Sequence, residues 1–583
     1  MSTRQIRRLR RDLEREKEDD TTPPPKLVIS INKPKFSFAM LRDALDSDDE
    51  SSSDAEEDSS SDDDSSSSAS DHEEVVPCST PDRYTQPPKN GRLGNKRASK
   101  PQNDDESSDE DSDMHLLESC KETNTESADV SVSATMENRF ECLRIEPRAF
   151  RVVGVGTQAS GKARMGKGFG GYLQGRNWLM PGIAPKTADK LRAAVVQQVR
   201  LKGNYDSKNE RERFTLELSD RYKNIQSVCI AAIDTQDPAL FRRVLETNPQ
   251  HLEVLLRASS IHTLQGQHEE AFKLITVAVQ ILQAALPPRF SPFRLDEKGC
   301  YNTWLPSSCG SNLIVYRLLL LYMICLERQA QWETCLAVCK LMLQMDFPND
   351  VSHALLHIDL YLLNYAGVGV AEFATGYAKA LEYAVPLYWV LPNFAFSMAL
   401  EFFAKDTNEA VTATISESYL DLLQEFLTLK EDELGFRFNP VEQDMRKYTN
   451  KRSELCLIRA LVKYPDIIRM LTRENFAADL VVYTQTEPFA SWMSDYDTDD
   501  VHLIKCYLAK TADLWRNENL SLLINTASLI ADIYRTERGA TILGTFRDLW
   551  SAFRLDQPLP LTPKEVIVSE FDLTSHSLPT ALE

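Results

Sequence analysis

Apolar residues return at helical spacing over most of the chain beyond Pro185. Between Leu252 and Leu264, and again between Ala271 and Leu282, they recur every three or four positions, which is the period of a helix with one buried face. Gly266 separates the two stretches and Pro287 ends the second. Glycine and proline punctuate helices in this way, so the pattern predicts a helical hairpin.

A second hairpin is predicted from Leu313 to Leu326 and from Trp332 to Met345, with Pro348 closing the unit. Gln267 and Gln331 occupy matching places in the two hairpins and lie 64 residues apart, about twice the 34-residue length of a tetratricopeptide repeat. A bulky residue after the turn, apolar residues down one face and a terminal proline are also typical of that repeat. The pattern therefore indicates a degenerate form of it.

Further helical stretches continue the pattern toward the C-terminus. They are predicted at 351–365, 371–383, 394–403, 414–429, 446–464, 503–516 and 520–535. Strand patterns are few, so the predicted fold is all-α: a degenerate tetratricopeptide-like α-solenoid over residues 186–550, followed by a C-terminal tail, 551–583. Stacked hairpins share one core and leave a concave surface suited to peptides or protein segments.

The first 135 residues have a different composition. The formal net charge of the chain is −21, and fifteen acidic residues stand against Arg42 alone between Leu41 and Glu74. Such a tract buries too little apolar surface to fold, which predicts a long disordered acidic N-terminal region, 1–135, with sites for phosphorylation. It serves either as a solvating tail or as a specific docking tail. Residues 136–185 follow as a Gly/Lys/Arg-rich arm and linker.

Cysteine usage and apolar runs indicate the compartment. The 11 cysteines, an odd number, are scattered through apolar patterns, as is typical of buried thiols in a reducing compartment. The apolar run Leu313–Leu326 contains Arg317 and is shorter than the roughly 20 residues that cross a bilayer. The basic N-terminus has no apolar core of a secretory signal. We therefore expect no membrane contact and a cytoplasmic location, with the nucleus as an additional compartment.

Two basic segments are candidates for binding RNA phosphates. The glycine-rich arm carries Lys162, Arg164, Lys167 and Arg176 among aromatic residues that can stack on bases. The N-terminal segment carries Arg4, Arg7, Arg8, Arg10 and Arg11. Two alternatives stay open: the arm is a linker whose aromatic residues pack back on the solenoid, and the N-terminal arginines are a nuclear import signal.

The segment from Gly156 to Ala163 is one residue short of a phosphate-binding P-loop. Its Lys162 is in the right place, but Ala163 replaces the hydroxyl residue that would reach Mg²⁺. The helix whose N-terminus must meet the phosphates is replaced by a glycine-rich run, and no series of alternating strands and helices follows. We therefore do not expect nucleotide hydrolysis or a cofactor.

Other residue pairs are better explained by packing than by chemistry. His353 and His357 have the spacing of a metal pair on one helical face, but Leu356 replaces the glutamate of a hydrolase helix and no third ligand is near. Cys335 and Cys339 fill small positions of a repeat helix. No serine, histidine and carboxylate arrangement can be isolated, so we expect no catalytic residue and no metal site.

Several short motifs, read in order, resemble the transcription-factor-25-like family, which includes the ribosome quality control complex subunit one. The first is the basic N-terminal start from Met1 to Arg10. The others are the candidates for protein binding or for a family motif: Asn138, Arg139, Phe140, Trp178, Leu391, Pro392, Asn393, Phe394, Phe396 and Trp515. The resemblance extends over most of the chain from residue 138 to about 535.

The resemblance implies a non-enzymatic scaffold or adaptor of ribosome-associated quality control. Such a protein binds the stalled large ribosomal subunit and its RNA, works with a Listerin-type ubiquitin ligase and helps to recruit a segregase ATPase, assisting ubiquitination and extraction of the nascent chain. Direct contact with ubiquitin chains is left open. The family also implies an alternative, a nuclear transcriptional regulator or repressor that acts through protein–protein contacts.

Overall fold

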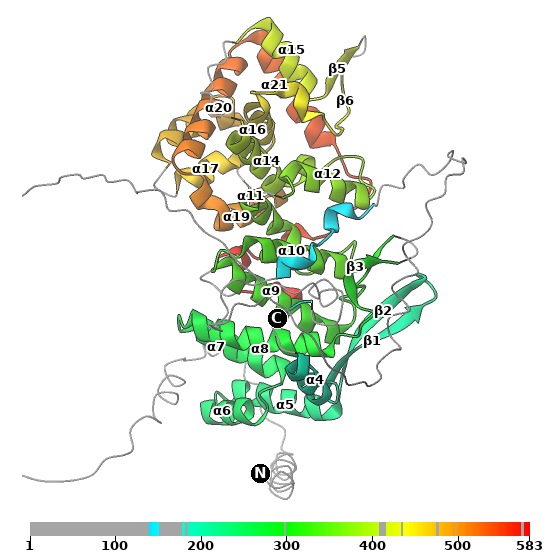
Figure 1. Cartoon of the computed structure of the whole chain (residues 1–583). Helices are drawn as coiled ribbons and strands as arrows, with labels where there is room; N and C mark the ends of the chain where they lie inside the picture. Colours follow the sequence, from blue (N-terminus) through cyan, green and yellow to red (C-terminus); the bar gives the residue numbers. More distant parts are fainter. Residues whose placement is uncertain are drawn as a thin grey trace, which may run out of the picture. The chain divides into compact units, whose positions relative to one another are not determined.

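The structure, a computed structural model, is mostly helical (Figure 1). It describes residues 139–150, 178–180, 185–296, 299–365, 367–406, 415–432, 435–473, 477–494, 496–572 and 577–582. The prediction of a disordered acidic region at 1–135 lies outside the described residues. The all-α class is confirmed for the described part of the chain.

The first helices form pairs that follow one another in sequence. They are α4 (Pro185–Val195), α5 (Asp220–Asp234), α6 (Pro238–Thr247), α7 (Leu252–Leu264) and α8 (His268–Ala285). The Ser219 hydroxyl accepts from the backbone N of Tyr222 and so caps α5, and Asp237 caps α6 in the same way before a proline at the first helical position. α5 contacts α6, α6 contacts α7, and α7 packs on α8, as expected for stacked hairpins.

The middle of the chain continues the stack with α9 (Leu313–Glu327) and α10 (Trp332–Met345). α10 has the bounds that the apolar pattern predicts. The window Gly310–Glu327, which includes α9, is long and apolar enough to cross a membrane by composition, but 67% of it is buried inside the body. Arg317 of α9 pairs with Glu253 of α7 at 3.0 Å, as suits a helix packed between other helices.

The two central hairpins turn in the same way, 64 residues apart. Gly266 and Ala330 both have positive φ, +77° and 53°. Gln267 donates from its backbone N to the carbonyl of His262 at 2.8 Å, and Gln331 donates to that of Leu326 at 3.0 Å. This is the hydrogen-bonded helix end that a left-handed residue allows. The 64-residue register predicted from the sequence is therefore present in the backbone.

Further helices, with α14 among them, complete the described body. The list is α11 (Ile358–Asn364), α12 (Val370–Ala380), α13 (Leu387–Val390), α14 (Pro392–Lys405), α15 (Glu417–Phe426), α16 (Arg452–Lys463), α17 (Asp466–Thr472), α18 (Phe489–Trp492), α19 (Asp499–Thr511), α20 (Glu518–Tyr534) and α21 (Glu537–Ala552). α14 contacts α11, α12, α13, α16 and α19, which places it at the centre of this half (Figure 1).

Within the residues that the structure describes, three two-stranded antiparallel hairpins interrupt the helices. They pair β1 (Val199–Asp206) with β2 (Arg211–Leu218), β3 (Ser291–Leu295) with β4 (Tyr301–Asn302), and β5 (Leu429–Asp432) with β6 (Gly435–Phe438). Val199 pairs with Leu218, and Phe214 also donates to the carbonyl of Trp304 at 2.8 Å. The solenoid predicted from residue 186 therefore contains a β-hairpin at 199–218, where Phe214 and Leu216 are buried at alternating positions.

The segments on either side of the predicted solenoid join its core. Phe140 and Phe150 of the predicted arm, and Val566 and Leu582 of the predicted tail, are buried in the same apolar cluster as the helices. The 139–150 segment, cyan in Figure 1, lies beside α10 and α12. The body of the protein thus includes chain on both sides of the helical repeats.

Candidate functional site

The motif from Leu391 to Ser397 begins α14 and lies in the core. Pro392 takes the first helical position, where its missing N–H is not needed. Leu391, Asn393, Phe394 and Phe396 are all buried. The sequence made these residues candidates for protein binding or for a family motif, and the structure places their side chains in the core, where they pack.

A network of buried hydrogen bonds lies in the core beside the motif. Asn393 donates from Nδ2 to the carbonyl of Leu355 at 2.9 Å and to Asp359 at 3.0 Å, and the Ser397 hydroxyl donates to Asp359 at 2.6 Å. Burial raises the pKa of the Asp359 carboxyl, although these two donors act against the rise. These buried hydrogen bonds fix how α11 and α14 pack.

A buried ion pair links α19 to α9. Lys510 Nζ lies 2.9 Å from Glu327 Oε2, and the two side chains are 3% and 4% exposed. Lys510 also donates to Nδ1 of His357 at 2.6 Å and to the hydroxyl of Tyr361 at 3.1 Å. Burial, with the charge of Lys510 next, holds the pKa of His357 well below its usual value. His357 is therefore a neutral acceptor for the ammonium group.

Phe396 and Trp515 meet in an aromatic cluster. The ring of Phe396 stacks on Tyr507 with centroids 5.8 Å apart and meets Trp515 edge-on at 5.9 Å. Trp515 is fully buried. These two predicted motif residues therefore contact each other from positions far apart in the sequence, and they hold α14 against α19.

Arg139 and Phe140 dock the N-terminal end of the described chain onto α12. Arg139 donates from Nε to the carbonyl of Ala380 at 2.9 Å and pairs with Glu382 at 2.7 Å. The Phe140 ring meets Phe347 edge-on at 5.1 Å. Gln344 donates to the carbonyl of Leu143 at 2.7 Å. Side chains of the helices thus bind the backbone of the 139–150 segment as they would bind a peptide.

A groove of about 1500 Å³ opens beside this segment. Its walls are the 139–149 segment, α10, α12 and residues 442–446. Charges of both signs line it, and most are paired within the protein, as Arg144 is with Glu141 and Lys379 is with Glu442. A groove neutralised in this way fits a protein segment better than it fits a polyanion.

Trp178 anchors the far end of the predicted basic arm. Its ring lies 5.2 Å from that of Phe150 and 5.6 Å from that of Phe293. The residues between Phe150 and Trp178 include five basic and no acidic side chains. The contact brings both ends of that stretch together on the body. Lys162, Arg164, Lys167 and Arg176 lie outside the described residues, as do Asn138 and the N-terminal arginines Arg4, Arg7, Arg8, Arg10 and Arg11.

The predicted histidine pair does not share a helix. His353 has φ 53° and precedes a 3-10 turn at Ala354–Leu356, and α11 begins only after His357. The cause is Asp350, whose carboxylate accepts from the backbone N of Ala354 and of Leu355, both at 2.8 Å. The expected helical face was therefore wrong. His353 instead pairs with Glu570 at 2.7 Å.

The described part of the chain offers few candidates for a metal-binding or reactive site. Within those residues no group of three histidine, cysteine or acidic side chains could hold a metal ion. Cys335 and Cys339 are fully buried in α10, and burial raises the pKa of both thiols. Their predicted place in the core is confirmed, and buried thiols of raised pKa are unreactive.

Two buried cations were missed by sequence reasoning. Arg459 of α16 lies under aromatic rings, 4.3 Å from the centroid of Trp389 and 4.8 Å from that of Tyr388. Lys463, one turn later, lies 4.0 Å from the Trp550 ring, and burial lowers the pKa of its amine to about 7. Cation–π contacts replace carboxylate partners at both positions.

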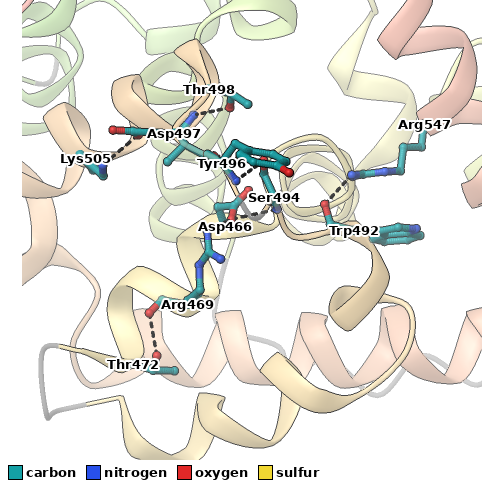
Figure 2. A network of polar contacts seen from close by, with 11 residues as sticks. Asp466, Arg469, Thr472, Trp492, Ser494, Tyr496, Asp497, Thr498, Lys505 and Arg547 are labelled. Carbon is teal, nitrogen blue, oxygen red and sulfur yellow. Dashed lines mark hydrogen bonds and ion pairs between the residues drawn. The ribbon is translucent and has the colours of Figure 1, made fainter.

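A polar network fixes the surface turn between α18 and α19 (Figure 2). Asp466 accepts from the backbone N of Ser494 at 3.3 Å, and Arg547 of α21 donates to the carbonyl of Trp492 at 2.5 Å. The turn leaves the side chain of Tyr496 81% exposed. An exposed tyrosine is a typical contact residue of protein interfaces.

These features define the class: an α-helical repeat protein whose helices pack against non-helical segments of its own chain. A family model described as "Transcriptional repressor TCF25" matches residues 214–583. The match covers more than half of the chain, and the chain belongs to this family. The resemblance predicted from the short motifs is therefore confirmed.

Curated relatives carry ribosome quality control names. The human protein "Ribosome quality control complex subunit TCF25" is 28% identical over 241 residues, which are 38% of this chain and 32% of the human protein. "Ribosome quality control complex subunit 1" of Schizosaccharomyces pombe is 28% identical over 192 residues, 33% of this chain and 27% of the yeast protein. The matches span about a third of the length of these relatives. No solved structure matches the chain.

Proposed function

We propose that this protein is a non-enzymatic scaffold subunit of the ribosome-associated quality control complex. In this role it binds stalled large ribosomal subunits and brings a ubiquitin ligase of the Listerin type and a segregase ATPase to the nascent chain. The observation that carries the proposal is membership of a family whose curated relatives are named as subunits of that complex. Cytoplasmic location follows from the same proposal.

The architecture supports an adaptor role. A helical-repeat body offers long surfaces for protein segments, and the groove beside residues 139–149 has the paired, mixed charge of such a surface. Ribosomal RNA requires a different surface, because phosphates need unpaired cations. We assign that role to the N-terminal arginines and to the basic stretch whose two ends meet at Phe150 and Trp178.

Sedimentation tests the proposal directly. The full chain, with an affinity tag, is expressed in cells in which translation is stalled, and lysates are separated on sucrose gradients. We expect the protein to sediment with free large subunits and to copurify with a ubiquitin ligase and an ATPase. Absence from large-subunit fractions, under conditions in which the ligase is found there, would contradict the proposal.

The second candidate function is nuclear transcriptional repression, which the description of the matching family favours. The two functions predict that the protein is recovered in different cell fractions. A repressor is recovered with chromatin, and its abundance there does not change when translation is stalled. A quality-control subunit moves to the large subunit under the same treatment.

A further inference from the structure

The chain that follows α21 crosses the body without forming an α-helix among its described residues. It runs through 554–572 and 577–582 and contains 3-10 turns at Pro563–Glu565, Val568–Phe571 and Thr580–Leu582. Arg554, Asp556 and Gln557, which begin it, are exposed. We call residues 554–572 and 577–582 the C-terminal segment. They contact α9, α19 and the residues just before α11.

Side chains of the body hold the backbone carbonyls of the C-terminal segment. The Tyr383 hydroxyl donates to the carbonyl of Pro558 at 2.5 Å. A ring nitrogen of His502 lies 2.7 Å from the carbonyl oxygen of Val566, and Arg317 donates to the carbonyl of Leu582. Each of these partners lies on a different part of the body. Recognition of an extended backbone in this way is how proteins bind peptides.

Apolar side chains of the same segment fill the core at intervals. Leu561, Val566, Phe571 and Leu582 are buried, while Lys564 and Glu565 between them are exposed. The Phe571 ring lies 4.6 Å from the ring of His357. Buried anchor residues separated by exposed ones are expected where pockets on a body bind a peptide.

A buried ion pair adds specificity for an acidic residue beside the aromatic anchor. Glu570 Oε2 lies 2.7 Å from Nδ1 of His353, and the two side chains are 2% and 8% exposed. The other carboxylate oxygen of Glu570 accepts from the backbone N of Ile567 at 2.9 Å. The body therefore holds Glu570 and the phenylalanine that directly follows it, each through a histidine ring.

We propose that the groove formed by α9, α19 and the residues before α11 is a peptide-binding site, occupied in cis by the C-terminal segment. Its ligand class is a peptide without α-helix that places an acidic residue next to an aromatic one in a 3-10 turn, and a partner segment of that chemistry exchanges with the protein's own. The covalent link raises the local concentration of the segment to the millimolar range, so a free peptide competes poorly until that link is cut. The proposal is independent of ribosome binding.

The test cuts the link and leaves the rest of the full chain intact. A protease site is inserted between Asp556 and Gln557, and the cleaved protein is incubated with a fluorescent synthetic peptide of residues 557–583. We expect the cut segment to stay bound on gel filtration and the labelled peptide to replace it over time. The circular dichroism of the body should remain helical throughout.

Peptide variants locate the specificity without changing the body. Peptides with Glu570→Gln or Phe571→Ala should bind at least tenfold more weakly than the natural sequence. A peptide with Glu565→Gln, which removes an exposed carboxylate five residues away, should bind like the natural one. Equal binding of all variants would overturn the proposal.

Two further outcomes also overturn it. Immediate loss of the cut segment, with no measurable binding of the labelled peptide, would mean that the groove has no affinity of its own. Exchange that occurs only when the body unfolds would mean that the segment is an inseparable part of the core.

Discussion

Asn393 and Asp359 are hydrogen-bonded at 3.0 Å in the core, where each side chain is 1% exposed. They lie 34 residues apart and join the start of α14 to α11. An asparagine in a short motif is easily taken for a contact residue at the surface. Here it connects two helices inside the core. Substitutions in the motif should therefore reduce the stability of the fold, and any loss of partner binding should follow from that loss of stability.

The turn at Ala330 offers a test of the repeat. Ala330 has φ 53°, which disfavours any residue with a Cβ, whereas its counterpart Gly266 has φ +77° and open space around it. We expect Ala330→Gly to raise the free energy of unfolding by about 0.5–1 kcal/mol. Gly266→Ala should lower it by a similar amount. Urea unfolding followed by circular dichroism measures both, and a loss of stability in Ala330→Gly would contradict the shared turn.

Breaking the buried ion pair of α19 should be strongly destabilising. Lys510→Met leaves Glu327 buried without its cation, and we expect a loss of about 3–5 kcal/mol in the free energy of unfolding. Lys510→Met with Glu327→Gln should recover most of that loss. The matched control on the same helix is Lys505→Met, whose partner Asp497 is exposed, with an effect of about 0–1 kcal/mol. Equal losses at both lysines would contradict the buried pair.

The pair of His353 and Glu570 makes stability depend on pH. Burial acts to lower the pKa of His353, but the hydrogen bond and charge of Glu570 outweigh it, and the pKa is raised above 6.5. Its stabilisation is therefore fully present below pH 6.5 and is lost as pH rises through the folded-state pKa.

We expect Glu570→Gln to lower the free energy of unfolding by about 1.5–3 kcal/mol at pH 6 and by less at pH 9. Urea titrations at the two values measure the difference. In a His353→Gln background the same glutamate substitution should show no such pH trend. A loss of stability in Glu570→Gln that is larger at pH 9 than at pH 6 would contradict this interpretation of the pair.

Salt dependence tests the basic segments as RNA contacts. Replacing Arg7, Arg8, Arg10 and Arg11 with Gln should reduce the log–log slope of large-subunit binding against salt by roughly one unit per lost phosphate contact. The same measurement on a variant with Lys162, Arg164 and Lys167 replaced by Gln tests the second segment. Unchanged slopes in both variants would leave the helical body as the anchor.

The incomplete P-loop should not bind nucleotide. Ala163 lacks the hydroxyl that would hold Mg²⁺, so we expect no Mg²⁺-dependent binding of ATP or GTP by titration calorimetry. Tight binding that disappears in Lys162→Ala would restore an enzyme as the better hypothesis.

The helices and their repeat could be predicted because hydrophobic period reports burial directly. α10 and the 64-residue register are the best examples. The start of α11 could not be predicted, because Asp350 diverts the backbone through hydrogen bonds that have no periodic signature. The β-hairpin at 199–218 was missed because its alternation is short: Val199 and Leu201 mark the buried face of one strand, and Phe214 and Leu216 mark that of the other.

The candidate site was harder to predict because the relevant contacts are long-range. Arg459 and Lys463 have the spacing of a solvated helical face, yet aromatic rings from other elements surround both. The C-terminal segment contains four prolines and its apolar residues have no helical period, so its sequence is typical of a tail. Its burial depends on grooves that exist only once the helices have packed.

The contact between Phe150 and Trp178 also limits the reach of the basic stretch. Phe150 and Trp178 are in contact, so covalent geometry allows no residue of the stretch that joins them to lie farther from this contact than about half the stretch's length. At about 3.4 Å per residue, its tip stays within about 45 Å of that contact. The Lys162 and Lys167 ends of any crosslink must therefore lie within about 45 Å of the contact between Phe150 and Trp178. When the protein is docked on a larger particle, that contact gives the centre of the allowed region and this distance gives its radius.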